Sequence, residues 1–303
     1  MGKLRIGIRK TRLMQLAAEQ MAEQIAQEFP DIKPEILAIE AEIKGKSEDP
    51  EENIRDLENA LLDKQVDLIL HLLKEIPVAL PEKIELKAVT ERMTPFDALV
   101  SNCDCPFLDE LPDTASLGVS HVRQSEQLGL FRPDLRFVEL KGSVDSRLQQ
   151  MESRNLAGII LSAASLERLD LQSRVTEMIM GDILLPGPGQ GCLGILALRS
   201  SRKWNAILEF LGDATSRLET TAERAFLSQL ADNPDAPLAV LAAVDSTEII
   251  IEAFLANPET HRSVRDSVRG PSQFAEELGL KLAIELSLRL GEGGLLSVDT
   301  DES

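Results

Sequence analysis

A cationic and an acidic side chain stand side by side where an apolar run ends. In VDLILHLLKEIPVALPE, residues 66–82, the apolar residues continue almost unbroken to Leu73, and Lys74 and Glu75 follow before Pro77. Such a run is typical of a buried strand. A lysine at a strand end can bind a carboxylate, and a glutamate beside it can exchange protons or stabilise a cation. The alternative is a solvated lysine–glutamate pair that closes the strand.

Composition narrows the class of ligand. The chain has 303 residues, a formal net charge of -19 and a sequence pI near 4.6. Nucleic acids and anionic membranes require basic surfaces, so both are disfavoured as partners. A small anionic ligand is compatible with this charge if a few arginines converge locally. We expect a monomer, and a protein partner stays open.

The segments that would direct the chain to a membrane are missing from the sequence. No stretch approaches the roughly 18 apolar residues of a membrane span. The first residues, MGKLRIGIRK, have no apolar signal core. The cysteines, Cys103, Cys105 and Cys192, form no regular framework, which fits a reducing compartment. The sequence therefore predicts a cytoplasmic protein.

Strands and helices alternate through the first two thirds of the chain. The expected strands there are 4–8, 35–39, 66–72, 117–120, 137–141 and 157–163, and the expected helices are 11–29, 52–64, 122–131 and 144–152. Residues 85–92 and 96–102 are expected to be strands or connectors, and the Pro/Gly-rich stretch 184–198 is expected to lead into a further strand. This alternation favours mainly parallel sheets with sites at the carboxyl ends of strands. Helices are expected over 206–212 and 216–230, then antiparallel strands over 237–244 and 247–256 and a last helix over 271–290.

The pattern predicts an α/β fold with two lobes and a small C-terminal α+β domain. The first lobe is expected to comprise residues 1–96 and 186–210, the second 97–185, and the C-terminal domain 214–303. Two-lobed solute-binding proteins have similar lobes. The missing signal sequence and the extra C-terminal domain count against that class.

Several stretches, taken in order, resemble the hydroxymethylbilane synthase family, also called porphobilinogen deaminase. They are LRIGIRKTRL, HLLKEIP, SHVRQSEQLGLFRPDL, KGSVDSRL, IILSAASLERLDL, PGPGQGCLGI and TAERAFLSQL. Together they cover nearly the whole chain. The resemblance implies two periplasmic-binding-protein-like α/β lobes and a role in tetrapyrrole (porphyrin) biosynthesis. Members of the family are transferases that condense porphobilinogen into a linear tetrapyrrole. They build it on a dipyrromethane primer, which one cysteine holds through a thioether.

The resemblance also implies an arginine-lined cleft between the lobes, because the ligands carry several carboxylates. Bidentate guanidinium pairs add geometry as well as about 1.5–3 kcal/mol each. Glu75 stands at the family's catalytic aspartate, with a longer side chain. The substrate-binding residues implied are Arg9, Thr11, Lys74, Ser120, Arg123, Lys141, Arg147, Arg168 and Gln190. Lys141 and Gln124 replace family arginines, and Gly189 and Gly191 are expected to form a hinge or a tight turn.

The sequence departs from the family where the primer is attached. Counted from Gln190 without gaps, Pro234 stands at the attachment cysteine, and no cysteine follows Cys192. A proline cannot form the thioether, so we expect no covalent cofactor. Cys192 lies on an expected buried strand and is a poor substitute, and the Cys103-Asp104-Cys105 stretch is too sparse for a zinc site. No metal is expected.

A second departure concerns the segment between the second strand and the next helix. Residues 40–62, EAEIKGKSEDPEENIRDLENALL, are acidic and lack the family's glycine- and lysine-rich lid. Two hypotheses follow. One is a divergent enzyme that uses Glu75 as its acid–base group and holds its primer noncovalently or at another residue. The other is a non-catalytic paralogue that binds a pyrrole, another carboxylate ligand or a protein partner.

Overall fold

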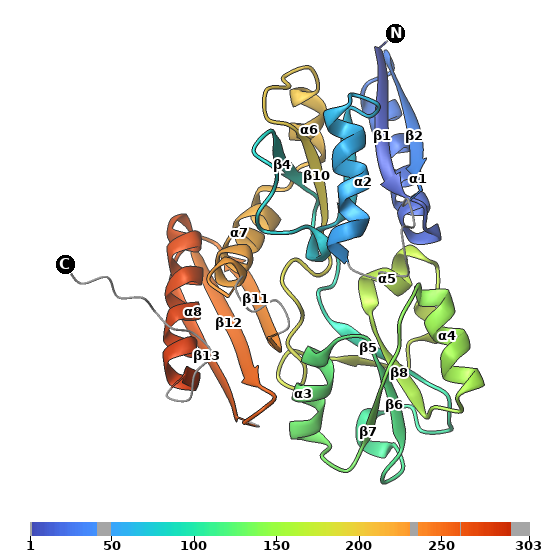
Figure 1. The fold of residues 1–303 in the computed structure, drawn as a ribbon, viewed down its shortest axis with the longest axis vertical. Helices are drawn as coiled ribbons and strands as arrows, with labels where there is room; N and C mark the ends of the chain where they lie inside the picture. The colour runs from blue at the N-terminus through green and yellow to red at the C-terminus, as the bar shows by residue number, and fades with distance from the viewer. Residues whose placement is uncertain (1, 41–49, 231–235, 261, 292–303) are drawn as a thin grey trace, which may run out of the picture. The chain divides into compact units, whose positions relative to one another are not determined.

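The computed structural model of the protein describes residues 2–40, 50–230, 236–260 and 262–291 (Figure 1). The chain divides into two compact units. The first comprises Met1–Pro95, Ser162–Arg174 and Gly189–Arg217, and the second comprises Phe96–Leu161, Val175–Pro188 and Leu218–Ser303. Pro234 and most of the expected lid segment, residues 41–49, lie outside the described residues.

The first unit is built on a mixed sheet with the strand order β2-β1-β3-β10-β4. β1 runs parallel to β2 and β3, whereas β10 runs antiparallel to β3 and β4. Its strands are β1 (Gly2–Arg9), β2 (Ile32–Ile39), β3 (Leu68–Leu72), β4 (Ile84–Val89) and β10 (Leu193–Leu198). Its helices are α1 (Arg12–Glu28), α2 (Pro50–Leu62), α5 (Ala163–Arg168) and α6 (Asn205–Leu211), with short 3-10 turns η1 (Leu73–Glu75) and η3 (Gln172–Arg174).

Apolar spacing explains how α1 and α2 pack in this unit. The buried residues of α1 recur three or four positions apart, which places them on one helix face. α2 buries Ile54, Leu57 and Leu61 in a core that also contains Ile69 of β3 and Leu196 of β10. The side chains of β3 are buried as far as His71, as expected of a central strand.

The second unit contains a sheet with the order β7-β6-β8-β5-β9. β6 runs parallel to β7 and β8, and β9 runs antiparallel to β5. The strands are β5 (Asp97–Ser101), β6 (Ser116–Val119), β7 (Arg136–Glu139), β8 (Gly158–Ser162) and β9 (Glu177–Ile179). The helices are α3 (Val122–Phe131) and α4 (Val144–Ser153), and η2 is Leu108–Glu110.

A separate antiparallel sheet, β11-β12-β13, forms the C-terminal part of the second unit (orange and red in Figure 1). The strands of this sheet are β11 (Leu238–Asp245), β12 (Glu248–Asn257) and β13 (Arg262–Pro271). The helices beside it are α7 (Ala214–Ser228), η4 (Ser272–Phe274) and α8 (Ala275–Gly291). Phe226 of α7 and Leu282 and Leu286 of α8 share one core with the apolar residues of the sheet. Gly279 of α8 allows close approach to α7, because an added Cβ would lie 2.2 Å from the Ala222 carbonyl oxygen.

The outer edge of β11 is closed by hydrogen bonds from neighbouring segments. Ala242 and Val244 donate their backbone N–H groups to Glu223 and Glu219 of α7, at 3.0 and 3.1 Å. Val240 donates to the carbonyl oxygen of Pro186 at 3.1 Å. These alternate amides point away from β12, so the glutamates of α7 complete the hydrogen bonding of an edge strand.

The predicted fold class is confirmed: two sheet-and-helix lobes and a small C-terminal domain are present. The sheets are mixed, since β9 and β10 run antiparallel to their neighbours. Two strands were not predicted. β13, RSVRDSVRGP, is largely polar and β9 has three residues. Within the described ranges no helix is both long and apolar enough to cross a membrane.

Candidate functional site

The chain turns sharply where β3 ends, and this turn presents the lysine and the glutamate. After Leu72 the backbone forms the 3-10 turn η1. Leu73 and Ile76 are 1% and 2% exposed and anchor the turn in the core of the first unit. Lys74 and Glu75 between them stay half-buried. The apolar anchors on either side therefore fix the direction of both charged side chains.

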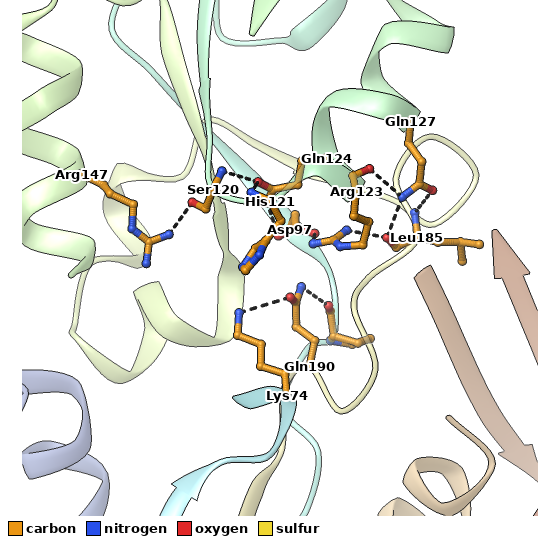
Figure 2. A network of polar contacts seen from close by, with 11 residues as sticks. Lys74, Asp97, Ser120, His121, Arg123, Gln124, Gln127, Arg147, Leu185 and Gln190 are labelled. Carbon is orange, nitrogen blue, oxygen red and sulfur yellow. Dashed lines mark hydrogen bonds and ion pairs between the residues drawn. The ribbon is translucent and has the colours of Figure 1, made fainter. Parts of the chain in front are cut away.

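Gln190 contacts Lys74 from the segment that precedes β10. Lys74 Nζ lies 3.5 Å from Gln190 Oε1, and Gln190 Nε2 donates to the Pro95 carbonyl oxygen at 2.7 Å (Figure 2). Arg92 donates to the backbone oxygen of Gln190 at 3.0 Å. Gln190 is 2% exposed. Its side chain is thus held from two sides, and it orients the lysine.

The glycines beside Gln190 are required by the backbone. Gly189 has a φ of +73°, and an added Cβ would lie 2.9 Å from Leu73 Cγ and 3.2 Å from the Lys74 nitrogen. Gly191 has a φ of +92°, and its Cβ would lie 2.5 Å from the Met93 oxygen. Side chains are disfavoured at both positions. The GQG stretch (Gly189–Gln190–Gly191) is therefore a tight turn packed directly on η1.

Arg168 approaches the same turn from α5. Its Nη2 donates to the carbonyl oxygen of Gly191 at 2.9 Å. The residue is 8% exposed, and burial lowers the pKa of Arg168. Within the described residues Arg168 has no ion-pair partner closer than 4 Å. A buried guanidinium without a carboxylate is costly, and an anionic ligand would offset that cost.

Arg9 and Thr11 lie where β1 ends. β1 and β3 are parallel neighbours with Gly7 opposite Ile69, so Arg9 lies at the same sheet edge as η1. Thr11 is the N-cap of α1, and its Oγ1 accepts the N–H of Met14 at 3.2 Å. Arg9 is half-buried, and no hydrogen bond or ion pair of its guanidinium occurs among the described residues. Arg9 is thus available to an anion, while the Thr11 hydroxyl has a structural partner.

In the second unit the predicted residues lie in a network of polar contacts. Arg123 is 5% exposed; its Nη2 lies 2.9 Å from Asp97 Oδ2, and its Nη1 donates to the Leu185 carbonyl oxygen (Figure 2). Gln127 contacts Leu185 twice, donating to its oxygen at 3.1 Å and accepting its N–H at 2.9 Å. Arg123 therefore joins α3 to Asp97 of β5 and to the backbone at Leu185.

Gln124 takes a structural position in the same network. Its Oε1 accepts the backbone N–H of Ser120 at 2.7 Å and that of His121 at 3.3 Å, and so caps α3. Its Nε2 donates to Asp97 Oδ1 at 3.1 Å. The residue is 2% exposed. The amide serves one carboxylate and two backbone donors, which a guanidinium, having no acceptor, could not do.

Arg147 and Lys141 are more accessible than Arg123. Arg147 Nη1 donates to Ser120 Oγ, which ties α4 to the end of β6, and its Nε donates to the Gly142 oxygen at 2.9 Å. Lys141 is exposed and lies 3.9 Å from Glu139. The structure therefore brings Ser120 and Arg147 together at the end of β6.

Two residues of the site were missed by sequence reasoning. Asp97, at the start of β5, is 1% exposed and is the counter-charge of Arg123. A charged residue opening the apolar run FDALVS is a signal that could have indicated it. His71 is 2% exposed, and its Nδ1 lies 3.7 Å from Glu75 Oε2. A histidine inside an apolar strand, four residues before the glutamate, is a signal that could have indicated it.

The cysteines all lie in the first two thirds of the chain. Residues 193–303 contain none. Cys192 is 1% exposed, and it lies directly before β10 and not on the strand where it was expected. Cys103 and Cys105 lie on a loop of the second unit; Ser101 and Cys105 lower the pKa of Cys103 against the effect of burial. In the part of the chain that is described, no group of three His, Cys, Asp or Glu could hold a metal.

Two solved structures align with part of this chain. A periplasmic substrate-binding protein of an ABC transporter from Coxiella burnetii aligns with a TM-score of 0.44 and 15% identity, over 71% of this chain and 94% of that one. A substrate-binding domain of a putative molybdenum ABC transporter from Clostridium difficile aligns with a TM-score of 0.44 and 13% identity, over the same shares.

Sequence comparison places the chain in a family. Residues 4–206 match the model "Porphobilinogen deaminase, dipyromethane cofactor binding domain", and residues 217–287 match "Porphobilinogen deaminase, C-terminal domain". The porphobilinogen deaminase of Natranaerobius thermophilus is 32% identical, over 97% of this chain and 98% of that protein. That of Bordetella parapertussis is 35% identical, over 94% and 92%. The chain therefore belongs to the porphobilinogen deaminase family, the dipyrromethane-dependent deaminases of tetrapyrrole biosynthesis.

Proposed function

We propose that the protein binds porphobilinogen or linear pyrroles through Arg9, Lys74 and Arg168, and that it does so without a dipyrromethane primer at position 234. The family supplies the ligand class, because residues 4–206 match its dipyrromethane cofactor binding domain. The family resemblance of the sequence assigns Lys74, Arg168 and Gln190 to pyrrole carboxylates. The inter-lobe cleft expected from the sequence stays a prediction. So do the cytoplasmic location and the monomeric state.

One observation carries the proposal: the GQG turn joins two cationic side chains that come from distant parts of the chain. Gln190 contacts Lys74, and the neighbouring Gly191 accepts a hydrogen bond from Arg168. Arg168 is buried without a carboxylate partner in the described residues. A ligand carboxylate would supply the missing counter-charge, and each charge-assisted hydrogen bond would contribute about 1.5–3 kcal/mol.

The remaining predicted ligands differ in how well their contacts support the proposal. Arg147 and Ser120 already contact each other at the end of β6 and could receive a carboxylate together. Arg123 has its two Nη groups engaged by Asp97 and Leu185, which supports a structural contribution. Thr11 caps α1, and Lys141 is exposed. The Arg147–Ser120 pair is therefore the best-supported candidate of the second unit.

Glu75 is the proposed acid–base group. It is half-buried beside Lys74, at the end of a strand, where a carboxylate can face a bound pyrrole. A nearby carboxylate stabilises a developing cation and can move the proton of a leaving amine. Its extra methylene, relative to the family's aspartate, changes the reach of the carboxylate by roughly an ångström, and such a change can cost about a hundredfold in rate.

The alternative is a non-catalytic paralogue that binds a pyrrole or another carboxylate ligand. The specific observation in its favour is that no cysteine follows Cys192, so the family's thioether cannot form in residues 193–303. The binding residues around the GQG turn are shared by both proposals. Turnover, rather than binding, separates them.

The first test is the intact mass of the protein, purified from cells that make porphobilinogen. We expect the mass of the sequence alone, because residues 193–303, which include position 234, contain no cysteine. An excess equal to a dipyrromethane would contradict the primer-free proposal and would make Cys192→Ser the next variant.

The second test is porphobilinogen consumption by the wild type and by Glu75→Gln. A rate of porphobilinogen consumption that is about 100-fold or more lower in the variant would support the enzyme hypothesis, since general acid–base groups contribute that much to the rate. Binding measured by calorimetry without consumption would favour the paralogue. If the wild type neither binds nor consumes porphobilinogen, the proposed ligand class is overturned.

A further inference from the structure

We infer that His71 positions Glu75 by donating a hydrogen bond from Nδ1 to the glutamate carboxylate, an inference that rests on the proposed role of Glu75. His71 lies in β3 and is 2% exposed, and Glu75 follows in η1 with its side chain 34% exposed. Nδ1 and Oε2 are 3.7 Å apart. Catalytic hydrogen bonds are often this long without ligand and shorten when ligand binds.

The surroundings of the two ring nitrogens differ, and this difference selects a tautomer. Nδ1 lies 3.3 Å from the Leu72 carbonyl oxygen and close to Glu75, both of which are acceptors. Nε2 is buried and has no hydrogen-bond partner within the described residues. A proton on Nε2 would leave a buried donor unpaired and would turn the Nδ1 lone pair toward a carboxylate. The proton therefore belongs on Nδ1.

Burial favours the neutral form of the ring. Burial lowers the pKa of His71; the Glu75 carboxylate opposes this effect, and Arg9 at the end of β1 adds to it. β10 pairs with β3 on the other side, with Gly194 opposite His71, and LGILAL contains no titratable side chain. A neutral ring can donate from Nδ1 without adding a positive charge beside the site.

The contact bears on the longer side chain at position 75. A glutamate has one more rotatable bond than an aspartate, and each free rotor lowers the fraction of time spent in a productive geometry. A hydrogen bond from a buried ring fixes the carboxylate relative to β3. His71 thus restrains the residue whose extra methylene would otherwise leave it poorly placed.

The direct test uses the full-length chain labelled with nitrogen-15 in its three histidines. We expect His71 to show the Nδ1–H tautomer at neutral pH in long-range proton–nitrogen spectra. We also expect Glu75→Gln to lower the pKa of His71, because the variant removes the carboxylate charge that raises it. An Nε2–H tautomer, or a pKa of His71 that is the same in both proteins, would overturn the inference.

A pair of variants tests the positioning role itself. His71→Asn keeps an N–H donor near the place of Nδ1, whereas His71→Leu keeps the bulk and removes the donor. We expect Leu to lower kcat for porphobilinogen consumption about 10- to 100-fold with little change in KM, and Asn to restore most of it. Equal losses in both variants would indicate a packing role and would overturn the inference.

The two tests separate the inference from the proposed function. If the wild type consumes no porphobilinogen, the proposed enzyme fails, and the nitrogen spectra still decide whether His71 donates to Glu75. If either histidine variant fails to fold, the Glu75→Gln spectra serve alone, since that variant leaves the core histidine in place.

Discussion

Asp97 and Arg123 form an ion pair with 2.9 Å between Oδ2 and Nη2, and their side chains are 1% and 6% exposed. Gln124 donates to the other oxygen of the same carboxylate at 3.1 Å. One aspartate at the start of β5 thus receives both polar residues at the beginning of α3. The arginine that the family resemblance assigned to substrate is held by a charge within the protein.

We expect Asp97→Ala to lower the free energy of unfolding by about 3–5 kcal/mol, because it leaves the Arg123 charge buried without its partner. Urea denaturation measures the change. The matched control is Glu248→Ala, which removes the partner of Arg269 from an exposed pair in the same unit and should cost at most about 1 kcal/mol. An equal change in the free energy of unfolding in the two variants would show that the buried Asp97 pair contributes no more to stability than the exposed pair.

His71 predicts a dependence of stability on pH. Its pKa in the folded protein is lowered from the ordinary value of 6.5, chiefly by burial. The unfolded chain therefore binds more protons just below pH 6.5, and the free energy of unfolding falls as the pH falls through that range. One such group contributes a slope of at most about 1.4 kcal/mol per pH unit. Above the ordinary pKa the contribution of His71 is fully present.

Urea denaturation of the wild type and of His71→Asn, between about pH 5 and about pH 8, checks this sign. The variant should show a smaller loss of stability on acidification, since the carboxylates that titrate in both proteins cancel in the comparison. A variant with the same slope as the wild type would contradict the lowered pKa.

Gly189→Ala should destabilise the GQG turn. The φ of +73° disfavours a side chain, and the new Cβ would lie 2.9 Å from Leu73 Cγ, so we expect a loss of about 1–3 kcal/mol in the free energy of unfolding. Ligand binding should weaken as well, because the displaced turn packs on η1, which carries Lys74, and contributes Gln190, which contacts Lys74. Gly129→Ala, in helix α3, is the control. Its Cβ would lie 3.6 Å from Phe137 of β7, and the change should be neutral or should stabilise the protein by about 0.5–1 kcal/mol.

Lys74→Ala should raise the Kd for porphobilinogen about 10- to 100-fold, because it removes one charge-assisted hydrogen bond to a carboxylate. Isothermal calorimetry measures the change, and circular dichroism checks that the fold persists. Lys3→Ala is the control, since Lys3 is an exposed lysine near the opposite end of β1, paired with Glu35. A Kd that both variants leave unchanged would remove Lys74 from the proposed site.

Much of the fold could be predicted because its elements have simple periodicities. The strand at 66–72 and the helix at 11–29 were expected within a few residues of β3 and α1, since both follow buried apolar positions. β13 was missed because RSVRDSVRGP is mostly polar and its apolar residues, Val264 and Val268, are four apart. That spacing does not indicate a strand. Pairing with β12 along its whole length forms this strand.

The candidate site was less predictable, because burial and partners are tertiary properties. Sequence reasoning selected Lys74, Glu75 and Gln190, and the structure brings Lys74 and Gln190 together. It could not show that Gln124 would cap α3, since the replaced arginine indicated only a lost charge. The Pro234 prediction lies outside the described residues and stays a prediction from the sequence.

The closed edge of β11 has a consequence for the behaviour of the protein in concentrated solution. An open sheet edge can recruit a strand from another molecule, which is how many aggregates begin. The outward amides of Val240, Ala242 and Val244 are already bonded within the chain, two of them to Glu223 and Glu219. Two glutamates of α7 therefore leave fewer free backbone donors on the β11 edge for a strand of another molecule to pair with.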